Sequence, residues 1–105
     1  MIIYNVTLNV DDSIHDDWLT WMRETHVPEV MATGYFTEAR FTKVLVQEES
    51  GTTYSVQYTA PHMIAVQQYQ QHAGPELKQK TLERYGDKVV AFRTLLEVQE
   101  LFRNS

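Results

Sequence analysis

Apolar residues recur at every second position from Ile2 to Val10, in the segment IIYNVTLNV. This period of two predicts a β-strand with one buried face, because successive side chains of a strand point to opposite faces of a sheet. The same period recurs in residues 36–48, 52–60 and 88–101. A short turn joins the second and third of these segments, which are therefore predicted to form a hairpin.

The first helix is predicted to begin directly after the first strand. The sequence Asp11-Asp12-Ser13 supplies side chains that cap a helix N-terminus, and the apolar residues that follow have the spacing of one packed helix face. Pro28 lacks a backbone N–H group and pushes Val27 out of helical geometry, so we expect the helix to break or kink at about His26. A short turn should follow, with Gly34 as the C-terminal cap.

A second helix is predicted to open at Pro61, to be interrupted at Gly74-Pro75 and to end at Gly86. The resulting order, β-α-β-β-α-β, is that of the ferredoxin-like fold, an α+β architecture in which two helices cover one face of a four-stranded antiparallel sheet. Right-handed crossovers place the first and third strands at the centre of that sheet. Because no linker or repeat interrupts the pattern, residues 1–105 are predicted to form a single domain.

Composition excludes several classes of protein. The chain contains no cysteine, which rules out disulfides and thiolate metal sites. Its net charge of −5 argues against nucleic-acid binding, which depends on clustered Lys and Arg. No apolar run approaches the roughly 20 residues that cross a membrane, and the alternating N-terminus does not resemble a signal peptide, so we expect a cytoplasmic protein. No metal site or cofactor is predicted, because no two histidines have the spacing of metal ligands.

Several stretches together carry a resemblance to a known family. They are the opening MIIYNVTLNV, the segment WLTWMRETHVP at residues 18–28 with Gly34, FTEAR at residues 36–40, TYSVQYT at residues 53–59 and GDKVVAFRT at residues 86–94. The chain resembles a family of short bacterial proteins known only as a domain of unknown function, within the dimeric α+β barrel superfamily. The resemblance covers nearly the whole chain and implies the ferredoxin-like fold and a homodimer, without assigning an activity.

Related members of the superfamily include cofactor-free monooxygenases, haem-degrading enzymes, muconolactone isomerases and proteins linked to ring degradation. Several of them have an aromatic-rich first helix followed by His, Pro and Gly, similar to Trp18, His26, Pro28 and Gly34 in this chain. A shared fold does not by itself transfer chemistry, so the activities of these relatives remain alternatives for this chain.

His26 is the candidate catalytic residue. In one interpretation it is a polar group at the mouth of a cleft between helix and sheet, with Trp18, Trp21 and Met22 as ligand-binding neighbours. In the other, its ring satisfies backbone carbonyls that Pro28 leaves without donors, and this structural role is the one we favour. The other histidines are expected to have structural or surface roles.

The sheet face that no helix covers is predicted to form a homodimer interface. Its polar residues are expected to be Asn5, Thr7, Glu38, Arg40, Gln57 and Arg93. Its apolar residues are expected to be Ile3, Val44, Val46, Val89, Ala91 and Leu95. A face in water would carry more Lys and Glu and fewer Val and Leu, so this mixture indicates a partly buried surface. Two such faces packed together would bury more than roughly 1,000 Å².

We therefore expect a small cytoplasmic homodimer that binds a small apolar or aromatic molecule between helices and sheet. One alternative is a cofactor-free monooxygenase or isomerase that uses His26. Another is a structural or regulatory interaction module. An open cleft of roughly a few hundred cubic ångströms beside His26 would support the first two functions, whereas a filled core would favour the third.

Overall fold

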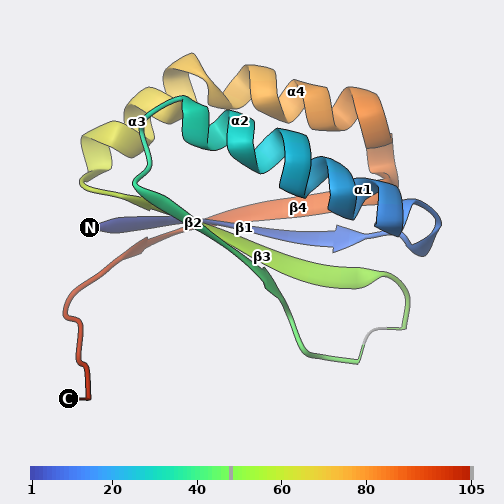
Figure 1. The fold of residues 1–105 in the computed structure, drawn as a ribbon, viewed down its shortest axis with the longest axis horizontal. Helices are drawn as coiled ribbons and strands as arrows, with labels where there is room; N and C mark the ends of the chain where they lie inside the picture. The colour runs from blue at the N-terminus through green and yellow to red at the C-terminus, as the bar shows by residue number, and fades with distance from the viewer. Residues whose placement is uncertain (48, 105) are drawn as a thin grey trace.

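The computed structural model describes residues 1–47 and 49–104 (Figure 1). Its main elements are β1 (Ile2–Val10), α1 (His15–Trp21), α2 (Val27–Ala32), β2 (Glu38–Lys43), β3 (Thr52–Ala60), α3 (Met63–His72), α4 (Gly74–Tyr85) and β4 (Val89–Glu97). A 3-10 turn, Asp12–Ile14, precedes α1, and another, Gly86–Lys88, follows α4. A π-helical segment, Met22–His26, joins α1 to α2.

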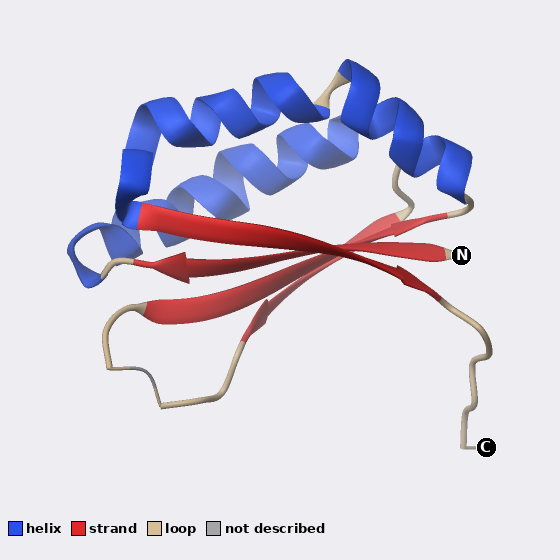
Figure 2. Cartoon of the chain, turned by 180° about the vertical axis from the view of Figure 1, so that it is seen from behind, coloured by secondary structure: helices blue, strands red, loops and turns tan. Residues whose placement is uncertain are grey.

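The four strands form one antiparallel sheet in the order β2-β3-β1-β4. The helices lie on one face of this sheet, as the two opposite views in Figures 1 and 2 show. The predicted ferredoxin-like architecture is therefore confirmed, with β1 and β3 at the centre. On both central strands buried residues alternate with partly exposed ones, which matches the predicted alternation. Among the described residues, no helix is long and apolar enough to cross a membrane.

The two edge strands are shorter than predicted. β2 ends at Lys43, so Val44 and Val46 follow the strand as loop residues, and Glu48 lies outside the described residues. β4 ends at Glu97. The chain after it leaves the sheet on the side opposite the helices, as both ribbon views show.

The predicted break near His26 is a change of helix type. Between α1 and α2 the backbone forms a π-helical turn, in which the N–H of Val27 donates to the carbonyl of Met22. Pro28 then lies in the first turn of α2, where a missing N–H group is tolerated. The wider π turn relieves the crowding between the proline ring and the preceding turn, so the chain stays helical through this point. Gly34 follows the end of α2 with a positive φ of 82°.

The direction in which the β4 side chains face differs from the prediction. Arg93 pairs with Val6 and Ala91 pairs with Leu8, and both of these β1 residues are buried beneath the helices. Arg93 therefore faces the helices, and its predicted place on the open face is wrong. Val89, Ala91 and Leu95 share its side, and Val90, Phe92, Thr94 and Leu96 occupy the open face instead. Because apolar residues occur at both alternating sets of positions in β4, the period of two could not select the inward set.

A group of four aromatic rings connects the central strands to α3. The rings belong to Tyr4, Phe36, Tyr58 and Tyr69, and their centroids are separated by 4.9 to 6.3 Å. All four residues are buried. Aromatic contacts of this kind add about 0.5–1.5 kcal/mol per pair beyond the burial of area. The mutual packing of these buried rings therefore fixes the positions of the three tyrosine side chains.

Candidate functional site

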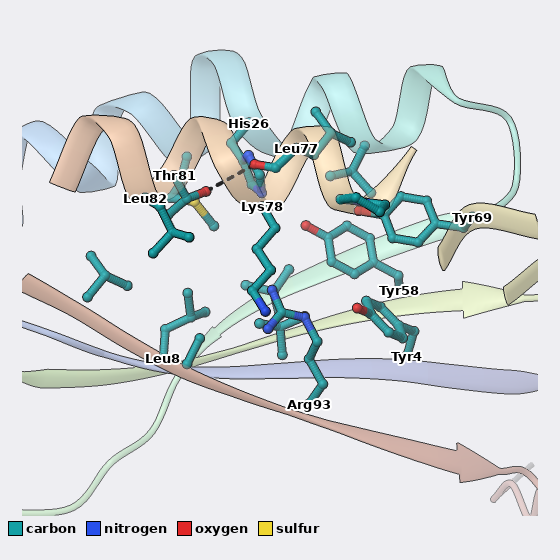
Figure 3. A pocket seen from close by; sticks show the side chains of 18 of the residues that line it. Tyr4, Leu8, His26, Tyr58, Tyr69, Leu77, Lys78, Thr81, Leu82 and Arg93 are labelled. Atoms are coloured by element: carbon teal, nitrogen blue, oxygen red, sulfur yellow. Dashed lines mark hydrogen bonds between the residues drawn. The ribbon is translucent and has the colours of Figure 1, made fainter. Parts of the chain in front are cut away.

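A cavity of about 470 Å³ lies between α4 and the sheet. Strands β1, β3 and β4 line it on the sheet side. On the helix side it is lined by α3, α4 and the continuous helical segment from α1 to α2, which we call the first helical segment (Figure 3). The lining residues are Tyr4, Val6, Leu8, Met22, His26, Val30, Val56, Tyr58, Tyr69, Gln70, Gly74, Pro75, Leu77, Lys78, Thr81, Leu82, Gly86, Val89, Ala91 and Arg93. A mainly apolar wall with a few polar groups is typical of a small-molecule site.

The cavity exists because α4 is held mainly along one edge. Lys80 forms an ion pair of 2.8 Å with Glu29 of α2, and Tyr85 donates a hydrogen bond of 2.7 Å to Asp17 of α1. These contacts hold α4 against α1 and α2. Beneath its other edge, most residues of β4 remain exposed. α4 therefore spans the space above β4 without filling it.

Three tyrosine hydroxyls converge at one end of the cavity. Tyr4, Tyr58 and Tyr69 come from β1, β3 and α3, and Figure 3 shows their oxygens directed into the open space. Burial raises the pKa of Tyr58, the neighbouring Tyr69 and Tyr4 raise it further, and Arg93 opposes this effect. Burial also raises the pKa of Tyr69 to about 12. The hydroxyls of Tyr58 and Tyr69 therefore stay protonated and can donate hydrogen bonds.

His26 lies on the helical side of the cavity (Figure 3). Its ring stacks on Trp21 with centroids 4.8 Å apart, and its Nδ1 atom is buried without a hydrogen-bond partner among the described residues. Burial lowers the pKa of His26 from 6.5 to about 4; the Glu29 carboxylate opposes this effect, and the cations Arg93 and Lys80 add to it. The ring is therefore neutral at pH 7. The expected role of satisfying open carbonyls is not seen at Nδ1.

Two cations enter the cavity from opposite sides. Lys78 extends from α4 toward the sheet, and Arg93 rises from β4 toward the helices (Figure 3). The lining residues include no Asp or Glu. The cavity is therefore positively charged, although the whole chain has a net charge of −5.

Of the ligand-binding neighbours predicted from the sequence, Met22 lines this cavity and the two tryptophans do not. Trp18 lies in the core: its side chain is 0% exposed and packs against Tyr54 with ring centroids 5.0 Å apart. Trp21 supports the ring of His26 from the other side. Trp21 is rotated by about 100° from its neighbour Met22. Trp18 lies one helical turn before Met22, where it packs against Phe41 and Tyr54 instead of the cavity.

The remaining histidines have structural or surface positions, as predicted. His15 Nε2 lies 2.6 Å from the hydroxyl of Tyr54, within hydrogen-bond distance. His62 caps α3 by accepting the backbone N–H of Ala65, and His72 is exposed. Within the described part of the chain, no cluster of three or more His, Cys, Asp or Glu side chains is arranged to hold a metal ion.

Sequence reasoning missed the tyrosines and Lys78 as site residues. Tyr4, Tyr58 and Tyr69 occupy core-facing positions, where their rings satisfy the apolar pattern and conceal the hydroxyl groups. The tyrosines themselves could have indicated the site, because a tyrosine hydroxyl at a core-facing position needs a hydrogen-bond partner or an open space. Lys78 has the sequence context of a solvated helix face, and its direction depends on how α4 lies above the sheet.

The predicted interface residues other than Arg93 share the open face of the sheet. They are Asn5 and Thr7 of β1, Gln57 of β3, and Glu38 and Arg40 of β2. The amide of Asn5 donates to the hydroxyl of Thr7 at 3.1 Å and accepts from the hydroxyl of Ser55 at 2.6 Å. The polar side chains at the middle of this face are therefore bonded to one another, which lowers the cost of covering them.

Solved structures share this architecture across nearly their whole length. A candidate antibiotic biosynthesis monooxygenase from Deinococcus radiodurans superimposes with a TM-score of 0.70 at 16% identity, covering 100% of this chain and 99% of that protein. An ethyl tert-butyl ether D (EthD) family protein from Bacillus halodurans C-125 superimposes with a TM-score of 0.67 at 14% identity, covering 94% of this chain and 100% of that protein. At these identities the similarity concerns the fold alone.

No functionally curated protein matches the sequence. A family profile does match it: residues 1–99 fit the profile described as "Domain of unknown function (DUF4286)". That match covers almost the entire chain, including every strand and helix described above. The chain therefore belongs to the DUF4286 family of domains of unknown function.

Proposed function

We propose that the cavity beneath α4 binds a small molecule with an apolar or aromatic body. The observation that carries this proposal is the cavity itself: about 470 Å³ lies within the range of roughly 300–1,000 Å³ that is usual for ligand sites. Apolar side chains such as Leu8, Met22 and Leu82 would contact the body of the ligand.

Polar groups around this space can orient the ligand. The tyrosine hydroxyls lie toward one end, and the neutral ring of His26 lines the helical side. Hydroxyl and imidazole groups can both exchange hydrogen bonds with a bound molecule.

A cofactor-free monooxygenase or isomerase that uses His26 is the second candidate. The position of His26 in the lining of the cavity supports it. A general base works best when its pKa is near the working pH, whereas burial lowers the pKa of His26 to about 4. The free protein thus has a weak base at this position, and catalysis would depend on a bound anion that raises this pKa. Loss of turnover in His26→Gln without loss of binding would assign the catalytic role.

The third candidate is a structural or regulatory interaction module. A filled space between helices and sheet would have favoured this function. The space beneath α4 is open. Ligand binding therefore accounts for more of the geometry than a purely structural role does.

The direct test is a thermal-shift screen of a metabolite library against two variants and the wild type. Ala91 lines the cavity from β4, so Ala91→Trp should fill the space. Ala32 is exposed at the end of α2 and is not a lining residue, so Ala32→Trp is the matched control. We expect compounds that raise the melting temperature of the wild type and of Ala32→Trp but not of Ala91→Trp. Hits that stabilise all three proteins equally would place binding elsewhere.

We also propose that the chain forms a homodimer through the open face of the sheet. In the structure, this face combines the polar residues Asn5, Thr7, Glu38, Arg40 and Gln57 with the apolar residues Ile3, Val90, Phe92 and Leu96. Phe92 is 62% exposed in the isolated chain, and the C-terminal segment adds exposed Leu101 and Phe102 on the same side. Exposed apolar residues gathered in this way mark an interaction surface.

A further inference from the structure

The positive charge in the cavity has no protein counter-charge. Lys78 and Arg93 both line the space, and none of the other lining residues is acidic. Neither cation takes part in an ion pair within the described residues, where Lys80 pairs with Glu29 and Arg84 pairs with Asp17. A site with two unpaired cations in an otherwise acidic chain attracts anions.

Arg93 is the more informative of the two cations because of its position in β4. Its helix-facing neighbours on the strand, Ala91 and Leu95, are apolar, so a long cationic side chain interrupts an apolar row. Both Arg93 and Lys78 are exposed to solvent, so an anion can reach them from water.

The groups that surround Arg93 can complete an anion site. Arg93 lines the same cavity as Tyr58, Tyr69 and His26 (Figure 3), and its positive charge lowers the pKa of all three side chains. The tyrosine hydroxyls are donors, and burial keeps His26 neutral, so neither of these groups repels an anion by charge. The guanidinium fork also matches the two oxygens of a carboxylate in geometry.

We propose that the cavity is a site for an apolar monocarboxylate, whose carboxylate is bound by Arg93 and Lys78. This inference rests on the proposed function and adds the chemical class of the ligand. Figure 3 shows the two cations between Leu8 and Leu82 on one side and the tyrosines on the other. The apolar body of the ligand would contact the leucines, and the tyrosine hydroxyls would donate to a carboxylate oxygen.

The test uses carboxylates and their uncharged amides, which have nearly the same shape. Calorimetric titrations at pH 7 would compare 2-naphthoate with 2-naphthamide as the aromatic pair and octanoate with octanamide as the aliphatic pair. We expect the carboxylate of the better-fitting pair to bind at least about tenfold more tightly than its amide, because an ion pair with Arg93 is lost in the amide. Added salt should weaken binding of the carboxylate and not of the amide.

Variants assign the effect to the two cations. Arg93→Gln should lower the affinity for the carboxylate about tenfold or more and leave that for the amide unchanged, and Lys78→Gln should have a smaller effect of the same kind. Lys43→Gln and Arg103→Gln remove charges that do not line the cavity and should change neither affinity. Retained amide binding shows that a variant is folded.

The outcomes separate the inference from the proposed function. If carboxylate and amide bind equally and Arg93→Gln changes neither, the carboxylate site is rejected while a binding cavity remains. If neither member of either pair binds the wild type, the proposed cavity function fails, and the inference fails with it. If octanoate is preferred over 2-naphthoate, the ligand class is aliphatic, and the reverse preference makes it aromatic.

Discussion

At the residue scale, burial sets the charge state of the groups in the cavity. It lowers the pKa of His26 to about 4 and raises the pKa of Tyr69 to about 12. At neutral pH both side chains are therefore uncharged, and they act through hydrogen bonds. The positive charge of the site comes from Lys78 and Arg93.

His26 should make stability depend on pH. Because its pKa in the folded chain lies below the ordinary value of 6.5, the unfolded chain binds the proton more readily. Its contribution is fully present above pH 6.5 and is lost as the pH falls toward 4. We expect the free energy of unfolding to lose about 3 kcal/mol over this range through His26. Urea denaturation of wild type and His26→Gln should show the loss in the wild type alone.

Exposed His72 provides the control for this measurement. His72→Gln should keep the pH dependence of the wild type, because this side chain is not buried on folding. Equal pH dependence in wild type, His26→Gln and His72→Gln would show that His26 is not held neutral by burial.

The two tryptophans of the first helix should differ in their effect on stability. Trp18 is 0% exposed, so Trp18→Ala should lower the free energy of unfolding by about 3–5 kcal/mol. Trp21 is only partly buried, and Trp21→Ala should cost about 1–2 kcal/mol. Chemical denaturation measures both values. A larger loss for Trp21→Ala would contradict the assignment of Trp18 to the core.

The sequence pattern predicted two residues of this site, His26 and Met22, but not the positions of its two cations. His26 and Met22 could be selected because the helical pattern and Pro28 placed them at a break on an inward face. Arg93 was assigned to the wrong face, because its strand is apolar on both sides and only pairing with β1 fixes its direction. The direction of Lys78 depends on the position of α4, which no local pattern encodes.

At the element scale, the turn between β2 and β3 should be more sensitive to substitution than the end of α2. Gly51 has φ of 76°, and a Cβ atom there would lie 2.7 Å from Asn9 Oδ1 and 2.8 Å from the backbone oxygen of Val10. Gly51→Ala should therefore cost at least about 2 kcal/mol, through both strain and overlap. Gly34 has φ of 82° in open space, so Gly34→Ala should cost only about 1 kcal/mol. Equal losses in thermal denaturation would contradict the close approach of the turn to β1.

Element types followed from the sequence more reliably than their ends and facing directions did. β1 and β3 are central strands with one clearly buried set of residues, so their limits and faces could be predicted. The edge strands lack a neighbour on one side: β4 ends at Glu97, opposite the first residue of β1, and β2 stops at Lys43, before the end of β3. Pro28 correctly indicated a disturbance of the first helix, but the π turn that accommodates it depends on packing.

At the scale of the whole molecule, a homodimer would cover the open face. Phe92→Glu should shift the chain from dimer to monomer, because a carboxylate without a partner is costly in a closed interface. Ile64 on α3 is 60% exposed, close to the 62% of Phe92, so Ile64→Glu is a matched control that should remain dimeric. Sedimentation at micromolar concentration distinguishes the two masses. A monomeric wild type would reject the dimer.

Methyl NMR can show whether a ligand occupies the space beneath α4. Met22 lines the cavity, whereas Met31 and Met63 do not, so the methionine methyl groups report on location. During titration with 2-naphthoate, we expect a saturable shift of the Met22 methyl signal and little change at Met63. An unmoved Met22 signal at millimolar 2-naphthoate, or shifts confined to Met31 and Met63, would show that the space beneath α4 is not a binding site for it.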